Sequence, residues 1–424
     1  MELYLKNIGK ISESLIEING ITVITGNNNT GKSTVGKTLF TIFESLYDIE
    51  RKVLDEKIDF IKDKILLIDN FLSDDVYINK RYIDSIIDNI ISNYEYLNTN
   101  TYEFKKYVLE PLYNLYCNDI DSKKNDRTKD LIYKLLEDLY VPNEDIIKRI
   151  LQKNLNNIFN QQVTSVLCES FSEIKLKLKN EHILINLDGN SNILKFEHKT
   201  VVITDAIYID NPLILDQFNQ ESKENISLNY NKSLLQKLFF TKQNNIIDEL
   251  SIENKLKSIY KKINLICSGK IIGDEIKGFN YTLENTEKTI NIKNLSIGIK
   301  TFAILKMLLE NGALKYNGII ILDEPEIHLH PEWQLLFAEI IVLLNKEFNM
   351  HILLTTHSPY FLNAIEVYSK KYKLENQTKY YLASNNKNGT SRIKDVSNNI
   401  EEIYKKLAKP FQTLENMEYA EDEN

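Results

Sequence analysis

The sequence predicts an α/β fold with a parallel central sheet, interrupted by a large and mostly helical insertion. Two apolar segments carry this prediction: ITVIT at 21–25 enters a glycine-containing loop, and IIIL at 319–322 ends in two adjacent carboxylates. Strand and helix patterns alternate in the last third of the chain, as a parallel sheet requires. Between Gly36 and Gly269 the one glycine is Gly189, which argues against a turn-rich β domain in the middle of the chain.

Composition indicates a soluble protein of the reducing cytoplasm. The 424 residues are 43% hydrophobic and 26% charged, and no apolar run approaches the roughly 20 residues that cross a bilayer. The formal net charge of −8 argues against indiscriminate coating of nucleic acid. Cys117, Cys168 and Cys267 form no CxxC pair, so neither a disulfide framework nor a cysteine zinc site is indicated. We therefore expect a cytoplasmic protein without a membrane partner.

Residues 1–45 are expected to form the first part of a nucleotide-binding domain. The alternating runs LYLKNI and SLIEI predict a hairpin, and the apolar ITVIT predicts a core strand. A helix from about Lys32 to Leu46 should follow the loop.

Residues 46–269 are expected to form the mostly helical insertion. Two apolar stripes have helical spacing, namely Ile83, Ile86, Ile87, Ile90, Ile91 and Tyr94, and Ile132, Leu135, Leu136 and Leu139. An island at 181–210 instead predicts three strands around a turn at Asp188 to Asn190. We expect this island to lie with the nucleotide domain or on its edge.

Residues 270–424 are expected to complete the nucleotide-binding domain. Its predicted elements are the strands FNYTLEN and KTINIKN, a helix from Lys300 to Glu310, the strand IIIL, a helix from Trp333 to Asn345, and the strands HILLTT and KYYLAS. A last apolar stripe from Ile400 to Leu414 has helical spacing, and Pro410 should begin or break a helix there. We interpret this stripe as packing on the protein itself, with docking of a partner as the alternative.

The loop GNNNTGKST has the GxxxxGK[ST] spacing of a phosphate-binding loop. Its glycines allow successive N–H groups to point inward, and the following helix adds its positive N-terminal end. We expect Lys32 to neutralise the β and γ phosphates and Ser33 to bind Mg²⁺. The predicted cofactor-binding residues of this loop are Gly26, Asn27, Asn28, Asn29, Thr30, Gly31, Lys32, Ser33 and Thr34.

Asp323 and Glu324 follow the strand IIIL directly, where a hydrolase needs its carboxylates. Asp323 is expected to hold Mg²⁺, and Glu324 to accept a proton from the attacking water. His357 in TTHSP ends another apolar strand and is placed to contact the γ phosphate. A solvated turn and a structural histidine are the alternative interpretations of these residues.

The segment NLSIGIK at 294–300 precedes an amphipathic helix and provides a second anion-binding feature. A serine hydroxyl, free N–H groups and the helix dipole would point the same way. His328, His330, His351 and His357 could suggest zinc, but the family resemblance described next implies that the segment EIHLHP shapes a subunit interface.

Taken in order, GNNNTGKST, LSIGIK, LDEPEIHLHP and TTHSP resemble the P-loop NTPases of the ABC type, in the SMC and RecF group. The resemblance is closer to OLD-like ATPases, and closest to the PtuA-like ATPase subunit of Septu-type anti-phage defence systems. It covers roughly residues 1–45 and 270–370.

This resemblance implies ATP and Mg²⁺ as cofactors and two heads that enclose two ATP molecules. Ser296 and Gly298 of one subunit would complete the site of the other. Lys300 resembles the basic residue that ends many SMC-type signatures and is expected to join them as a nucleotide contact. The usual Q-loop glutamine has no clear counterpart; Asp210, Asn211 and Gln217 are candidates. Tyr4 could stack on adenine, although packing within its strand is the favoured interpretation.

We therefore predict an ATP-hydrolysing regulator or sensor of a bacterial defence complex. Its head dimer would control a separately encoded effector, such as an HNH nuclease. OLD nucleases carry a Toprim domain after the histidine motif, but the residues after His357 show no matching carboxylate cluster, so no nuclease domain is recognised. The alternative is a RecF- or SMC-like repair ATPase that clamps DNA directly, and a transporter subunit ranks third.

Overall fold

A computed structural model of the protein describes residues 1–72, 88, 141–168, 170–217, 230–239, 256–274, 278–284, 286 and 288–422. The chain divides into two compact units, which we call the head unit (1–47 with 151–424) and the insertion unit (48–150). The expected insertion boundary at 269 differs from this division, because the strands that follow residue 170 join the sheet of the head unit.

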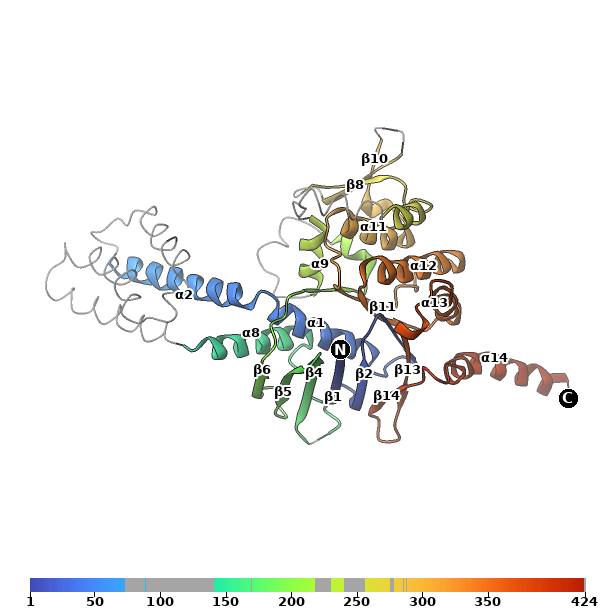
Figure 1. The fold of residues 1–424 in the computed structure, drawn as a ribbon, viewed down its shortest axis with the longest axis horizontal. Coiled ribbons are helices and arrows are strands. Elements are labelled where there is room, and N and C mark those ends of the chain that lie inside the picture. The colour runs from blue at the N-terminus through green and yellow to red at the C-terminus, as the bar shows by residue number, and fades with distance from the viewer. Residues whose placement is uncertain are drawn as a thin grey trace. The chain divides into compact units, whose positions relative to one another are not determined.

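The head unit is built on one mixed sheet that has eleven strands among the described residues (Figure 1). The strand order is β6-β5-β4-β1-β2-β14-β13-β3-β12-β11-β7. Their bounds are β1 Glu2–Ile8, β2 Ile11–Glu17, β3 Ile21–Gly26, β4 Ser172–Leu178, β5 Glu181–Leu187, β6 Ile193–His198, β7 Ala206–Ile209, β11 Ile319–Asp323, β12 His351–Thr356, β13 Thr378–Asn385 and β14 Ser391–Asp395.

Five neighbouring strands, β13, β3, β12, β11 and β7, run parallel, which confirms the α/β prediction. Asp323 pairs with Thr355, and Thr356 pairs with Thr25. The carboxyl ends of these strands therefore meet at one edge of the sheet, where ligands bind in open α/β folds. β3 and β7 are buried along their whole length, as parallel strands covered on both faces should be.

Helix α1 (Lys32–Leu46) covers one face of these parallel strands. A Cβ on Gly36 would lie 2.8 Å from Ile321 Cγ2 and 3.1 Å from Tyr208. This helix therefore touches the sheet closely at a position that only glycine can occupy without a shift. Its observed start and end match the predicted ones.

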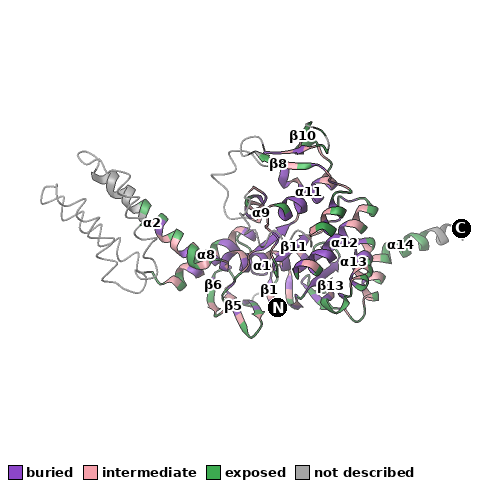
Figure 2. Ribbon diagram, turned by 45° about the horizontal axis from the view of Figure 1, so that its top comes forward, coloured by how far each residue is buried: buried purple, intermediate pink, exposed green. Residues whose placement is uncertain are grey.

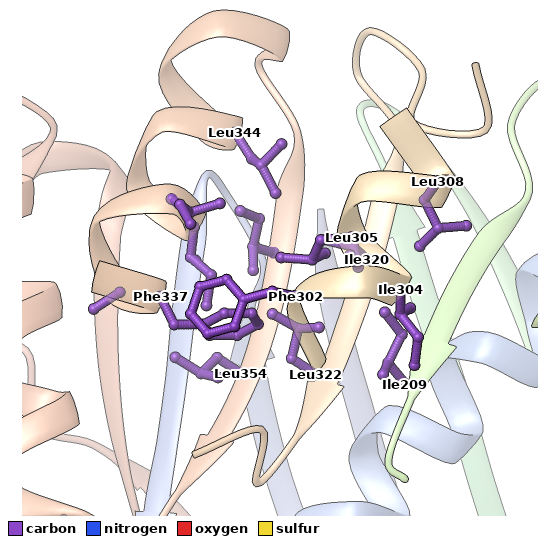
Figure 3. Packing of buried hydrophobic residues seen from close by; sticks show 14 of the residues in the cluster. Ile209, Phe302, Ile304, Leu305, Leu308, Ile320, Leu322, Phe337, Leu344 and Leu354 are labelled. Atoms are coloured by element: carbon purple, nitrogen blue, oxygen red, sulfur yellow. The ribbon is translucent and has the colours of Figure 1, made fainter. Parts of the chain in front are cut away.

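Helices α11 (Ile297–Glu310), α12 (Pro331–Phe348) and α13 (Pro359–Lys371) contribute to the core on the opposite face. Figure 3 shows side chains of α11 and α12 meeting those of the parallel strands. Ile320 and Leu322 point to this face while Ile321 points to α1, because successive strand residues alternate. The two predicted helices, α11 and α12, are confirmed with earlier starts: Ser296 caps α11, and α12 begins with a proline. Helix α13 was not predicted.

The N-terminal hairpin is confirmed, since β1 and β2 pair antiparallel. The predicted strand island forms β5, β6 and β7, with β5 and β6 at one sheet edge and β7 at the other. β4 was not predicted, because we expected this segment to be helical. The sequence feature that could have indicated a strand is the alternation of apolar Ile174 and Leu176 with charged residues. Both apolar side chains are buried, and pairing with β1 fixes the segment as a strand.

Apart from residues 48, 141 and 142, the described residues of the insertion unit are helical. They form α2 (Ile49–Leu72) and the first part of α8 (Asn143–Ile158), and Lys57 Nζ donates to Asn143 Oδ1 at 2.8 Å. The two predicted apolar stripes, Ile83 to Tyr94 and Ile132 to Leu139, lie outside the described residues.

The remaining described elements are a small sheet and several helices. A small antiparallel sheet consists of β8 (Lys270–Asp274), β9 (Gly278–Thr282) and β10 (Thr289–Asn291); β8 was not predicted. The other described elements are α9 (Tyr230–Phe239), the helical residues 256–263, and the short 3-10 helices η2 (Pro212–Asp216), η4 (Ile292–Asn294) and η5 (Glu375–Gln377).

The last helix, α14 (Glu401–Asp422), continues through Pro410, so the predicted break is wrong. Residues 408–411 are exposed, and water can bind the carbonyl that proline leaves without a donor. The apolar stripe has a buried and an exposed part: Ile403 is buried in the core, whereas Phe411 is 64% exposed. Figure 2 shows that much of the described length of α14 is exposed. No described helix is both long and apolar enough to cross a membrane.

Candidate nucleotide site

The loop after β3 has the backbone of an anion cradle. Gly26 and Gly31 have φ angles of 148° and 81°, and Asn29 also has positive φ. A Cβ on Gly26 would lie 2.4 Å from Ala383 O, and one on Gly31 would lie 2.8 Å from Ile11. Both glycines are therefore required for this path. Thr30 Oγ1 donates to Asn27 O at 2.8 Å and steadies the turn.

Lys32 lies across this loop. Its Nζ donates to Gly26 O at 3.2 Å and to Asn27 O at 3.1 Å, and the residue is 5% exposed. Burial lowers the pKa of Lys32, while the nearby carboxylate of Glu324 opposes that shift. The ammonium group is thus held inside the cradle, where a phosphate would meet it.

Glu324 and His357 reach the same lysine from two neighbouring strands. Glu324 Oε1 lies 3.5 Å from Lys32 Nζ and 2.7 Å from His357 Nε2. The hydrogen bond from His357 is the main reason that the pKa of Glu324 is lowered. Three predicted catalytic residues, separated widely in sequence, are thereby brought together.

His357 Nε2 also lies 2.7 Å from Lys32 Nζ. This nitrogen can donate to Glu324 when it carries a proton, or accept from Lys32 when it does not. The two interactions exclude each other at any one moment. The position of one proton therefore decides whether the histidine holds the carboxylate or the lysine.

Glu324 has a left-handed backbone with φ of 52°. Its N–H donates to Thr355 O at 3.2 Å and to Thr355 Oγ1 at 3.0 Å. Such backbone geometry costs free energy in a residue other than glycine and persists where neighbours fix it. Here it turns the carboxylate away from the strand and toward the loop.

Asp323 accepts hydrogen bonds from two hydroxyl groups that the sequence analysis did not identify. Tyr208 Oη donates to Oδ2 at 2.9 Å, and Thr355 Oγ1 donates to Oδ1 at 2.5 Å. Burial raises the pKa of Tyr208 well above its usual value, so this phenol stays a donor. Asp323 and the Ser33 hydroxyl at the start of α1 supply oxygen ligands of the kind that Mg²⁺ prefers.

Of the Q-loop candidates, Asp210 lies at the same height in the sheet as Asp323. It follows Ile209, which pairs with Leu322. Burial raises the pKa of Asp210, and the Asp323 charge adds to the increase. Asn211 instead caps η2 through a bond from Leu213 N at 2.9 Å, and Gln217 is exposed at the end of that helix.

Glu326 is a functional residue that the sequence analysis missed. The residue is 3% exposed, and its Oε1 accepts from Thr356 Oγ1, from His357 N at 2.9 Å and from Ser358 N at 3.3 Å. Burial raises the pKa of Glu326. This carboxyl group thus anchors the backbone that carries His357. The second glutamate of the segment DEPE was the sequence feature that could have indicated this role.

The signature residues lie elsewhere in the head unit. Ser296 is exposed and caps α11 by accepting from Ile299 N at 3.4 Å. Gly298 is buried, and a Cβ there would lie 3.0 Å from both His328 O and Trp333. Within the described part of the chain, the neighbours of Ser296 and Gly298 are Ile299, His328 and Trp333, and neither Lys32 nor Glu324 is among them. They remain a prediction for a site shared between subunits.

The position of Lys300 does not match its predicted role as a nucleotide contact. It is 2% exposed, and its Nζ donates to Asp216 Oδ2 at 2.7 Å and to Lys293 O at 3.3 Å. An ammonium this buried needs a carboxylate partner. Lys300 therefore joins α11 to η2 inside the protein, pointing away from solvent.

Tyr4 lies on β1, and both its packing and its adenine-stacking interpretations stay predictions. Its Oη donates to Glu13 Oε1 at 3.0 Å on the neighbouring strand. The ring lines a surface hollow of about 620 Å³, together with charged side chains of β1, β4 and β5.

Comparison with known proteins identifies relatives of this arrangement. The family model described as "AAA domain, putative AbiEii toxin, Type IV TA system" matches residues 21–363. The Retron Vc95 probable ATPase of Vibrio cholerae serotype O1 biovar El Tor is 38% identical over 109 residues, which cover 26% of this chain and 20% of the relative.

Two further relatives match other lengths of the chain. Septu protein PtuA of Bacillus thuringiensis is 28% identical, over 27% of this chain and 34% of its own. Endonuclease GajA of Bacillus cereus (strain HuB5-5) is 23% identical, over 81% and 52%. The chain thus spans about half or less of the length of these relatives. The SMC head domain from Thermotoga maritima is 12% identical over 93% of this chain and 98% of its own, with a TM-score of 0.35.

Proposed function

Since the chain belongs to the AAA domain family described as putative AbiEii toxin, Type IV TA system, we propose that it binds and hydrolyses ATP. The observation that carries this proposal is the meeting of Lys32, Glu324 and His357 beside the cradle loop, with separations of 2.7–3.5 Å. Few structural roles require a lysine at the start of α1 to meet a glutamate and a histidine that follow two parallel strands.

In this proposal the loop N–H groups and Lys32 bind the phosphates, and Ser33 and Asp323 hold Mg²⁺. The metal ion would neutralise charge on the β and γ phosphates when it is bound. Glu324 accepts the proton of the attacking water, and its lowered pKa keeps it ionised at neutral pH. His357 orients Glu324 and then contacts the γ phosphate.

We further propose that two heads enclose ATP between them. Exposure of Ser296 at the start of α11 supports this idea, because its hydroxyl and the helix dipole are free to meet a phosphate of another subunit. Gly298 contributes by allowing α11 to pack closely on the segment 327–330, which we place at the subunit interface. Lys300 has no part in the shared site.

The biological role that we propose is regulation of an anti-phage defence complex. Relatives named as a Septu protein and as retron ATPases support a defence role. The head dimer would control a separately encoded effector, such as an HNH nuclease. GajA is named an endonuclease, and we assign no such activity to this chain.

The test compares nucleotide binding and turnover in the wild type with those of Lys32→Met, using Lys175→Met on an exposed strand position as the matched control. Wild-type ATPase activity that disappears in Lys32→Met and survives in the control is expected. Absence of ATP binding by the wild type would refute the proposal. For the partner, co-expression with the product of the adjacent reading frame and mass measurement of the complex should give one defined assembly.

A further inference from the structure

Lys406 of α14 lies beside the cradle loop, although none of the site motifs includes it. Its Nζ donates to Ala383 O at 2.8 Å. Ala383 pairs with Gly26, the first glycine of the loop, and its carbonyl oxygen lies 2.4 Å from the place where a Gly26 Cβ would be. One carbonyl group therefore separates the Lys406 ammonium from the loop backbone.

No carboxylate of the described residues balances this ammonium. Among the described residues Lys406 forms no ion pair, whereas its neighbour Lys405 pairs with Glu401 and nearby Lys394 pairs with Glu402. Ala383 O occupies one of its three N–H donors, so two remain. A half-buried cation with free donors is normally matched by an anion.

Charge at the loop supports the same conclusion. Burial lowers the pKa of Lys406, and the positive charge of Lys32 lowers it further. Two lysines thus repel one another across a loop whose backbone is shaped for phosphate. An anion between them would remove this repulsion.

We propose that Lys406 is a second phosphate-binding cation, which contacts the α and β phosphates of the bound nucleotide. This inference rests on the proposed nucleotide site. The strand order indicates which phosphates Lys406 contacts. Glu324 and His357 follow β11 and β12, whereas Ala383 lies on β13, on the other side of β3. The γ phosphate faces the catalytic side, so the β13 side receives the other end of the phosphate chain.

The competing explanation is that Lys406 only fastens α14 to β13 through Ala383 O. Lys406→Gln separates the two roles, because glutamine keeps a donor for Ala383 O and removes the charge. Lys405→Gln is the matched control, since Lys405 is adjacent on α14 and its side chain is 80% exposed. Lys406→Arg restores the charge.

Affinity for ADP and for a non-hydrolysable ATP analogue is measured by titration calorimetry, with thermal unfolding of the nucleotide-free proteins alongside. Lys406→Gln should bind both nucleotides about tenfold or more weakly, as expected for a charge-assisted contact. Lys405→Gln should match the wild type, and Lys406→Arg should recover most of the affinity.

Unchanged affinity of Lys406→Gln for both nucleotides would overturn the inference, as would a loss confined to the ATP analogue. If Lys406→Gln does not fold, the dependence of nucleotide affinity on salt concentration is measured instead. Lys406→Arg should show the same dependence as the wild type. A wild-type affinity that does not change with salt would overturn the inference. A wild type that binds neither nucleotide refutes the nucleotide site itself, a different result.

Discussion

His357 Nε2 lies 2.7 Å from Glu324 Oε1. The two residues end adjacent parallel strands, β12 and β11, whose register places Asp323 opposite Thr355. When Nε2 carries a proton, the histidine therefore fixes the direction of the carboxylate and stabilises its charge. Most of the expected behaviour of the site follows from this pair and from the groups that hold it.

Glu324→Gln should lower ATP turnover by at least about 100-fold, because the amide cannot accept a proton from water. Nucleotide affinity should stay within about threefold of the wild type, since the loop and Lys32 are untouched. Phosphate release and ATP titration provide the two measurements. The control is Glu332→Gln, at an exposed position of α12. Turnover at the wild-type rate would show that Glu324 is not the base.

His357→Ala should move the acid limb of the ATPase pH profile to higher pH. The base acts as a carboxylate, so activity is lost as pH falls through the pKa of Glu324. The bond from His357 is the main cause of its lowered pKa, and removing that bond raises the pKa. His182→Ala, at a side chain 42% exposed, is the control. A His357→Ala variant whose rate is reduced but whose acid limb stays at the wild-type pH would contradict this role.

Glu326→Gln should gain stability relative to the wild type as pH rises from about 5 to about 8. Burial raises the pKa of Glu326 in the folded state. The folded protein therefore favours the protonated form, and stability is lost as pH rises above the unfolded-state pKa. Glutamine stays neutral and avoids this loss. Thermal midpoints of both proteins across this range test the sign, and a constant difference would refute it.

Lys300→Met should lower the free energy of unfolding by about 3 kcal/mol, because it leaves Asp216 without its buried partner. Binding of a nucleotide to the folded monomer should change little, since Lys300 faces Asp216 at 2.7 Å. Denaturant unfolding and ATP titration provide the two measurements. Full stability combined with weakened ATP binding would restore the role predicted from the sequence.

Ser296→Arg should abolish turnover while each head still binds ATP, because a large cation would block the approach of a second subunit. Ser296→Ala separates this effect from the lost helix cap, which is worth about 1 kcal/mol. Asn190→Arg, in the exposed β5–β6 turn, is the surface control. Turnover and mass in solution with ATP are measured. Normal turnover in Ser296→Arg would exclude the shared site.

The sequence by itself determined the nucleotide-binding half of this protein. The glycines of the loop, the apolar strands and the terminal Asp323, Glu324 and His357 could be assigned because each is a local pattern with one favoured backbone. Parallel strands end at a common sheet edge, so residues that follow them were expected to meet. Helix α1 was located to its terminal residues for the same reason.

Only the tertiary structure decided which polar residues face inward and which strands pair. β4 looked like part of a helical region until β1 was placed beside it. Lys300 matched a signature pattern, yet its nearest carboxylate, Asp216, lies on a different element. Glu326 and Lys406 gain their roles from partners far away in sequence. The strength of such contacts depends on burial and distance, which arise when the whole chain packs and which no local pattern contains.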